Sequence, residues 1–268
     1  MLNNFRLIIY KIFSFFKIGI ILYKHSKYID MVPIDKNEYL KFLKEHPDRG
    51  LYHKALERTT PNHAIPDTDI YKELRFFSLM QIIRYSINKN LDGDFAECGC
   101  FQGHSSYIIA KCLSDAHADK KFHIFDSFEG LSKRDKQLDQ SNSNTNDYLI
   151  RNELGRFACS EDEVKKNLCE FNFINFYKGW IPNRFKEVKD INFCFVHIDV
   201  DLYQPTYDAL SFFYERLVQG GAIVIDDYGS STYQGAENAV TEFLRDKKDY
   251  FLYEVPMGSA FIIKEKIK

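Results

Sequence analysis

The chain has 268 residues, of which 45% are hydrophobic and 16% aromatic, enough for one large domain or for a domain with an appendage. The formal net charge is -2 at pH 7 and no basic patch is interleaved with aromatic residues, which argues against a nucleic-acid-binding protein. Six cysteines without a CxxC pair argue against a zinc site, and we expect reduced, structural cysteines in a cytoplasmic protein.

An apolar stretch at residues 5–24 is interrupted by Lys11 and Lys17. Central lysines are costly in a spanning helix, and no small-residue cleavage site follows, so we expect neither a transmembrane helix nor a signal peptide. Two interpretations stay open. The stretch is a helix packed on the body or on a second subunit of a homo-oligomer, or it is an interfacial helix on the inner face of the membrane.

The first 90 residues are expected to form a helical N-terminal extension. An amphipathic helix is predicted over Lys36–Glu45. A longer helix is predicted to end at Asn88, after an N-cap at Thr68 or Asp69.

Beyond this extension, apolar strand-like segments alternate with helical ones. The expected strands are Phe95–Cys98, Phe122–Phe125, Asn175–Lys178, Phe193–Ile198 and Ala222–Ile225, followed by a terminal strand pair at Phe251–Val255 and Ser259–Lys264. The expected helices are Ser105–Ser114, Ser160–Phe171, Tyr207–Leu217 and Ala236–Arg245. This alternation predicts a doubly wound, mostly parallel α/β sheet over residues 91–268. The polar, aperiodic segment Lys133–Asn152 is expected to be a long loop.

A glycine-bearing turn follows the first of these strands. Residues 97–103 read E-x-G-x-x-x-G, with Gly99 and Gly103 between a strand and a helix. Glycines let a backbone approach a ligand closely, and the helix N-terminus offers free N–H groups. The spacing differs from G-x-G-x-x-G, which argues against a dinucleotide-dependent oxidoreductase. On its own the motif could equally be an ordinary turn.

Asp126 ends the second expected strand. An acidic residue here, some distance past a glycine turn, is where nucleotide-type sites hold ribose hydroxyls. The alternative is a helix N-cap. Because the glycine turn precedes it in the right order, we favour the ribose role.

Three aspartates end the last two parallel strands. Asp199 follows Phe193–Ile198, and Asp226 and Asp227 follow Ala222–Ile225. The carboxyl ends of parallel strands meet at the edge where open α/β sheets bind ligands. Carboxylates gathered there repel each other unless a cation lies among them, and Mg2+ takes oxygen ligands. The sequence therefore predicts a metal site at this edge.

Two neighbours compete for roles beside this cluster. Asp201 lies two residues beyond Asp199 and could share its face. His197 lies on the same strand face as Asp199. It could be a catalytic base, although a structural histidine within a strand is the simpler interpretation.

The order of these motifs resembles the macrocin and mycinamicin O-methyltransferases. The resemblance covers about residues 68–245 and rests on the glycine turn, DSFEGL at 126–131, KGWIP at 178–182, HIDVDLY at 197–203 and IDDYG at 225–229, with Gly235-Ala236 beyond. It implies a Rossmann-like class I methyltransferase fold. It also implies an enzyme that uses S-adenosylmethionine and Mg2+ to methylate sugar hydroxyls.

The resemblance also assigns roles residue by residue. Those expected at the cofactor are Glu97, Gly99, Gly103, Asp126, Ser127, Phe128 and Trp180. The metal ligands would be Asp199, Asp226 and Asp227, and Asp199 would also be the base, with His197 as a further catalytic candidate. A lid would come from about residues 49–75.

The chain departs from the family at the glycine turn. The family often has Trp-Arg-Gly-Gly where this chain has Phe101-Gln102-Gly103-His104. This change and the long polar loop leave the acceptor open: a nucleotide sugar or surface glycan is expected, and a catechol, a lipid or a phosphoryl-type group is the alternative. A non-catalytic S-adenosylmethionine-binding module is a further alternative of a different class.

Overall fold

The computed structural model describes residues 18–20, 33–35, 44–60, 70–135, 137–139, 157–230, 233–255 and 258–266. By its internal contacts the chain divides into two compact units, Met1–Gly50 and Leu51–Lys268.

In the first unit, β1 (Ile18–Ile20) pairs antiparallel with β2 (Pro33–Asp35). The helix expected over residues 5–24 is therefore wrong at Ile18–Ile20, where β-branched isoleucines favour a strand. The rest of that stretch, and most of the helix expected over Lys36–Glu45, lie outside the described residues. Among the residues that the structure describes, no helix is long and apolar enough to cross a membrane.

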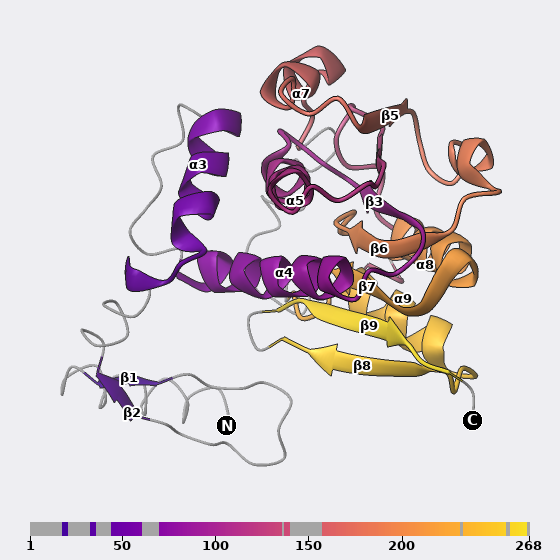
Figure 1. The fold of residues 1–268 in the computed structure, drawn as a ribbon. Coiled ribbons are helices and arrows are strands. Elements are labelled where there is room, and N and C mark those ends of the chain that lie inside the picture. Colours follow the sequence, from indigo (N-terminus) through magenta and orange to yellow (C-terminus); the bar gives the residue numbers. More distant parts are fainter. Residues whose placement is uncertain are drawn as a thin grey trace. The chain divides into compact units, whose positions relative to one another are not determined.

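The second unit is built on a seven-stranded sheet of order β5-β4-β3-β6-β7-β9-β8 (Figure 1). Its strands are β3 (Asp94–Cys98), β4 (Phe122–Asp126), β5 (Ile174–Lys178), β6 (Phe193–Ile198), β7 (Leu217–Ile225), β8 (Tyr250–Glu254) and β9 (Ala260–Lys264). The strands β3 to β7 are parallel, whereas β9 is antiparallel to both β7 and β8. The prediction of a mostly parallel, Rossmann-like α/β sheet is confirmed.

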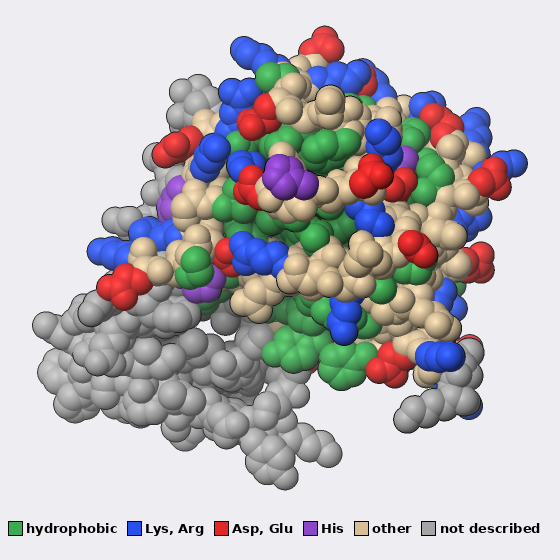
Figure 2. All heavy atoms as spheres, viewed as in Figure 1, with side chains coloured by type: hydrophobic (Ala, Val, Ile, Leu, Met, Phe, Trp, Pro, Cys, Tyr) green, Lys and Arg blue, Asp and Glu red, His purple; other side chains and the backbone are tan. Residues whose placement is uncertain are grey.

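Helices cover both faces of this sheet (Figure 1). They are α3 (Arg49–Thr59), α4 (Ile70–Asn88), α5 (His104–Asp115), α7 (Glu161–Asn167), α8 (Tyr203–Arg216) and α9 (Gln234–Leu244), with a short 3-10 helix at Phe185–Val188. One face carries α4 and α5, and the other carries α8 and α9. Charges of both signs are interspersed over the face that Figure 2 shows, in keeping with the small net charge.

Alternation along β3 and β6 decides which side chains meet which helix. Ala96 and Val196 belong to the apolar core with residues of α8 such as Phe213. Their neighbours Glu97 and His197 point to the opposite face, where α5 lies, because successive side chains of a strand alternate. The sheet therefore has an apolar face towards α8 and two buried polar groups towards α5.

Two boundaries at opposite ends of α8 differ from the expectation. Helix α8 begins at Tyr203, four residues before the predicted start, and β7 begins at Leu217 instead of Ala222. Pro205 lies in the first turn of the helix, where backbone N–H groups have no partner within the helix, so it does not interrupt it. The earlier start brings the helix directly after the Asp199–Asp201 segment.

Candidate active site

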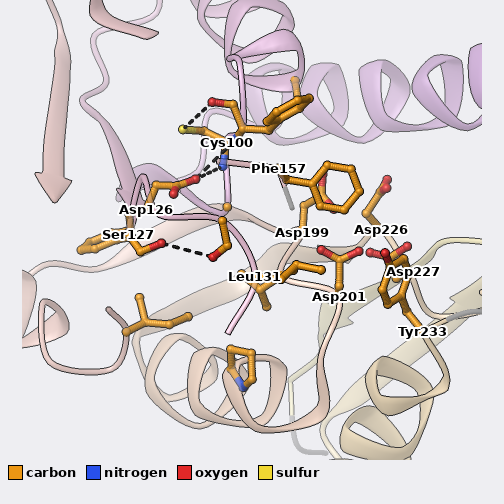
Figure 3. Close-up of a pocket in the computed structure, with 18 of the residues that line it drawn as sticks. Cys100, Asp126, Ser127, Leu131, Phe157, Asp199, Asp201, Asp226, Asp227 and Tyr233 are labelled. Atoms are coloured by element: carbon orange, nitrogen blue, oxygen red, sulfur yellow. Dashed lines mark hydrogen bonds between the residues drawn. The ribbon is translucent and has the colours of Figure 1, made fainter. Parts of the chain in front are cut away.

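A cavity of about 610 Å³ lies where the parallel strands end (Figure 3). Its walls come from the residues that follow β3, β4, β5, β6 and β7, and from α3 and α4. In Figure 3, Cys100, Asp126 and Ser127 lie on one side, and the aspartates that follow β6 and β7 lie on the other. The strand order reverses between β4-β3 and β6-β7, so this is the crevice at the topological switch point.

The glycine turn follows β3 and packs against the residue that follows β6. Gly99 has a φ of +82°, and a Cβ added there would lie 1.9 Å from the carbonyl oxygen of Asp199. Only glycine permits so close an approach of two backbones at this φ. Gly103, with a φ of +89°, precedes α5. The sequence motif thus places the glycine turn directly beside the first aspartate of the cluster.

Asp126 fixes the shape of that turn. Its Oδ2 accepts hydrogen bonds from the backbone N–H groups of Cys100 at 2.7 Å and Phe101 at 3.3 Å, and its Oδ1 accepts one from Phe128 at 2.7 Å. No described helix begins directly after Asp126, so it is not a helix N-cap. The carboxylate lines the cavity and retains acceptor capacity beyond these three bonds. A contact to ribose therefore stays a prediction.

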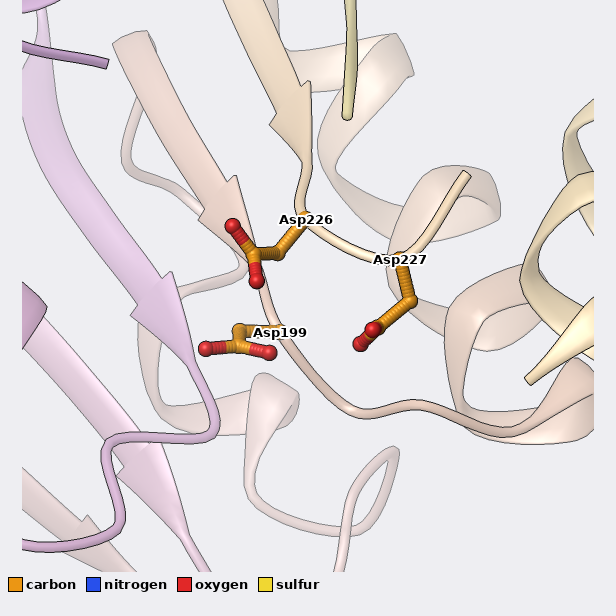
Figure 4. Close-up of side chains that lie close together, drawn as sticks. All are labelled: Asp199, Asp226 and Asp227. Carbon is orange, nitrogen blue, oxygen red and sulfur yellow. The ribbon is translucent and has the colours of Figure 1, made fainter. Parts of the chain in front are cut away.

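The three predicted metal ligands do come together (Figure 4). Asp199, Asp226 and Asp227 each offer an oxygen within 4.8 Å of the others. Arg75 of α4 forms an ion pair with Asp226, at 3.1 Å between Nη2 and Oδ2. The Oδ2 of Asp227 is buried and, among the described residues, accepts no hydrogen bond. The cluster thus combines close oxygen donors with a buried oxygen that lacks a donor.

Burial and repulsion between the carboxylates shift the pKa values of the three aspartates. Burial and the charge of Asp226 raise the pKa of Asp199 to about 7. Burial and the nearby Asp201 and Asp199 raise the pKa of Asp227 well above its usual value. Burial also acts to raise the pKa of Asp226, but Arg75 and His197 outweigh it and lower that pKa to about 2. A divalent cation with oxygen ligands would relieve this repulsion, so the residues fit Mg2+.

Beneath the cluster lies a fully buried Glu97–His197 pair. Glu97 accepts a hydrogen bond from Ser106 and lies 2.9 Å from Nδ1 of His197. The other ring nitrogen, Nε2, lies 3.9 Å from Oδ1 of Asp226. Burial lowers the pKa of His197, but Asp226 and Glu97 outweigh it and raise the pKa to about 10. A pKa of about 10 makes His197 positively charged at neutral pH. His197 does not line the cavity, which agrees with the interpretation of a structural histidine, and a catalytic role for it stays a prediction.

The sequence-predicted residues divide into two groups. Those that line the cavity are Gly99, Asp126, Ser127, Trp180, Asp199, Asp226 and Asp227. Those that lie behind its surface are Glu97, Gly103, Phe128 and His197. Glu97 of β3 and His197 of β6 are both 0% exposed, on the face of the sheet that α5 covers. Glu97 and His197 can orient the aspartate cluster from beneath, but they do not form part of the cavity wall.

Further residues of the cavity wall were not predicted individually from the sequence. The segment 49–75, expected to supply a lid, does contribute Leu56, Thr60, Lys72 and Arg75 to the wall. Phe101 and Phe157 also line the cavity, with ring centres 5.4 Å apart and φ values of 46° and 64°. Positive φ is rare for aromatic residues and cannot be recognised from residue type.

Several known proteins are similar to this chain in sequence. The sequence model of the macrocin-O-methyltransferase (TylF) family matches residues 29–251. Demethyldecarbamoylnovobiocin O-methyltransferase of Streptomyces niveus is 24% identical over 160 residues, 58% of this chain and 60% of that protein. Mycinamicin III 3''-O-methyltransferase of Micromonospora griseorubida is 26% identical over 163 residues, 58% of this chain and 62% of that protein. The chain thus aligns with about three fifths of the length of these relatives.

Solved structures share the fold over more of the chain. The O-methyltransferase NovP superposes with a TM-score of 0.59 at 22% identity, covering 87% of this chain and 100% of NovP. The S-adenosylhomocysteine-bound methyltransferase PaMTH1 of Podospora anserina superposes with a TM-score of 0.54 at 13% identity, covering 88% and 98% of the two chains. At these identities the likeness supports the class I methyltransferase fold alone.

Proposed function

This chain belongs to the macrocin-O-methyltransferase (TylF) family, and from that premise we propose that it transfers a methyl group from S-adenosylmethionine to a hydroxyl of a sugar in a Mg2+-dependent reaction. The observation that carries the proposal is the position of the Asp199, Asp226 and Asp227 cluster on the wall of the same cavity as the Gly99 turn. A cofactor turn and an oxygen-rich cation site in one cavity suit transfer to a hydroxyl group.

The sugar acceptor is supported by the named activities of several relatives. One acts on mycinamicin III, and a second is named a 4'-O-methyltransferase of a rhamnosyl tetracenomycin. The calicheamicin enzyme CalS11 is named a TDP-rhamnose 3'-O-methyltransferase. For this chain we propose a sugar with two neighbouring hydroxyls, carried by a nucleotide or by a glycan.

The residues of the cavity have separate roles in the proposed reaction. Gly99 and Asp126 would hold S-adenosylmethionine, which would supply the methyl group to the acceptor oxygen and leave as S-adenosylhomocysteine. Mg2+ held by Asp199, Asp226 and Asp227 would lower the pKa of the reacting hydroxyl. Asp199 would accept the proton, because its backbone lies against the glycine turn and its carboxylate belongs to the cluster.

The surrounding residues keep this arrangement in place. The Arg75 guanidinium holds Asp226 ionised, and the charged His197 supports it from below. Asp126 shapes the turn through Cys100 and Phe101. Reacting atoms must meet within about 3–3.5 Å, so such fixed contacts contribute to rate as well as to stability.

The direct test is formation of S-adenosylhomocysteine by the full chain, with Mg2+ and a panel of acceptors. The panel contains TDP-rhamnose, other nucleotide sugars, bacterial glycans and a simple catechol. We expect turnover with a sugar acceptor and none without an acceptor. Turnover with the catechol alone would overturn the sugar assignment, and cofactor binding without turnover on any acceptor would favour a binding module.

A further inference from the structure

One wall of the cavity comes from the last residue of the DSFEGL motif and the residues after it. We call residues 131–135 and 137–139 the wall segment. Its first three residues, Leu131, Ser132 and Lys133, line the cavity. Leu131 packs with Leu202 and Tyr233 in a small hydrophobic cluster. In Figure 3, Leu131 lies between the Asp126–Ser127 side and the aspartate cluster, so the segment borders the space where an acceptor would lie.

The last residue of the wall segment, Asp139, is a buried carboxylate that the proposed chemistry does not use. It is 6% exposed. Its Oδ1 accepts the backbone N–H of Tyr203 at 2.7 Å, and its Oδ2 accepts that of Asp135 at 2.9 Å. Tyr203 is the first residue of α8, whose N-cap Leu202 provides no side-chain hydrogen bond. Asp139 therefore satisfies a helix N–H from 64 residues away and places its charge at the favourable end of the helix.

Gly235 of α9 makes room for this contact. A Cβ at position 235 would lie 2.0 Å from Oδ1 of Asp139 and 2.6 Å from the backbone nitrogen of Tyr203. A side chain at position 235 would therefore have to displace the carboxylate of Asp139 or the backbone at the start of α8. Gly235 belongs to the motif on which the family resemblance rests, and this packing gives the glycine a physical reason.

Further bonds tie the wall segment to the residues around α9. Asn238 donates a hydrogen bond to the carbonyl of Leu138 at 3.1 Å. Arg134 donates one to the carbonyl of Asp139 at 3.2 Å, and its guanidinium lies 4.9 Å from the ring centre of Tyr233. Tyr233 itself lines the cavity. The segment is thus fixed on the helices that begin just after the two aspartate-bearing strand ends.

From these contacts we infer that Asp139 is a positioning residue for the acceptor. It fixes the wall segment on the N-terminus of α8, which begins four residues after Asp199, and so sets the distance between that wall and the aspartates. The inference rests on the proposed function, since it assigns the space beside Leu131 to the acceptor. The hydrogen bonds of the Asp139 carboxylate go to Tyr203 and Asp135 and not to the glycine turn or Asp126, so binding of the cofactor should not depend on it.

The test compares Asp139→Asn and Gly235→Ala with the wild-type full chain. Asp139→Asn keeps the shape of the side chain but loses its charge and one hydrogen-bond acceptor. Gly235→Ala keeps Asp139 but displaces its carboxylate with the added Cβ. Asp115→Asn, at an exposed helix position away from the cavity, is the matched control. Thermal melting verifies that each variant is folded.

Two readouts are measured. Hydrogen exchange at the amides of Tyr203 and Asp135 should be faster by about tenfold or more in both variants, since each loses a bond to a charged group. With the acceptor that gives turnover in the screen above, KM should rise by about tenfold, while the dissociation constant of S-adenosylhomocysteine changes less than about twofold. The control Asp115→Asn should match the wild type.

Unchanged exchange at both amides would overturn the anchoring by Asp139. Faster exchange with an unchanged acceptor KM, or with an equal loss of S-adenosylhomocysteine affinity, would overturn the positioning role. If wild-type protein methylates no sugar, the proposed function fails, and the exchange measurement still decides whether Asp139 anchors the segment.

Discussion

Nδ1 of His197 lies 2.9 Å from Oε1 of Glu97, and both side chains are completely buried beneath the aspartate cluster. The pair connects β3, which leads into the glycine turn, with β6, which leads into Asp199. Since the pKa of His197 is raised to about 10 against the cost of burial, the ring carries a positive charge at neutral pH. The contact therefore places a fixed cation under three carboxylates.

Removing the charge of Glu97 should destabilise the folded protein. We expect Glu97→Gln to lower the free energy of unfolding by about 3 kcal/mol, because it leaves the buried His197 without its countercharge. Urea unfolding at neutral pH measures the loss. The control Asp115→Asn, on the exposed face of α5, should stay within about 0.5 kcal/mol of wild type. An equally small effect of Glu97→Gln would show that His197 is not held as a cation.

A second prediction concerns the metal site and can be tested by thermal melting, without an assay of methyl transfer. In metal-free protein, Asp227→Asn should melt at the same temperature as wild type or higher, because it removes a charge that burial and its acidic neighbours disfavour. Added Mg2+ should stabilise wild type by about 2.7 kcal/mol at a hundredfold excess over its dissociation constant, and the variant much less. Equal stabilisation of both proteins by Mg2+ would place the cation elsewhere.

Asp199 should matter for chemistry more than for cofactor binding. We expect Asp199→Asn to reduce the turnover number by about 10²- to 10⁴-fold, since the variant can neither accept a proton nor contribute charge to the cluster. The affinity for S-adenosylhomocysteine, measured by calorimetry, should stay nearly unchanged. A fully active variant would remove Asp199 from the mechanism.

His104 gives a prediction about pH. Burial and the charge of Lys72 lower its pKa to about 3, against the effect of its contact with the Tyr52 carbonyl. Below pH 6.5 the unfolded chain binds a proton at this residue that the folded chain does not, so His104 makes the fold less stable as pH falls. The destabilisation by His104→Gln relative to wild type should shrink by about 2 kcal/mol between pH 7.5 and 5. A destabilisation that is constant with pH would contradict the neutral ring.

Residue patterns predicted the parts of the site that lie at strand ends. Asp199 and the pair at 226–227 each follow an apolar run, and parallel pairing of β6 with β7 brings them together. The same rule located Gly99 and Asp126. What the rule could not supply was the partner of each group, because a strand pattern does not say which side chains from other elements meet there.

The remaining site residues depend on packing across long sequence distances. Arg75 is one cation among several in a helix, and only the packing of α4 on the sheet identifies it as the partner of Asp226. Alternation placed His197 on the face of Asp199, yet its burial against Glu97 follows from the register of β3 with β6. Asp139 lies in a polar segment without periodicity, so nothing local distinguishes it.

The most direct measurement of the central claim is formation of S-adenosylhomocysteine from S-adenosylmethionine and a sugar acceptor, with and without Mg2+. It is made on wild type and on Asp199→Asn. The account predicts acceptor-dependent turnover by wild type that EDTA abolishes and Mg2+ restores, and little turnover by the variant. Sugar methylation that persists in EDTA, or that the variant carries out at the wild-type rate, would contradict it.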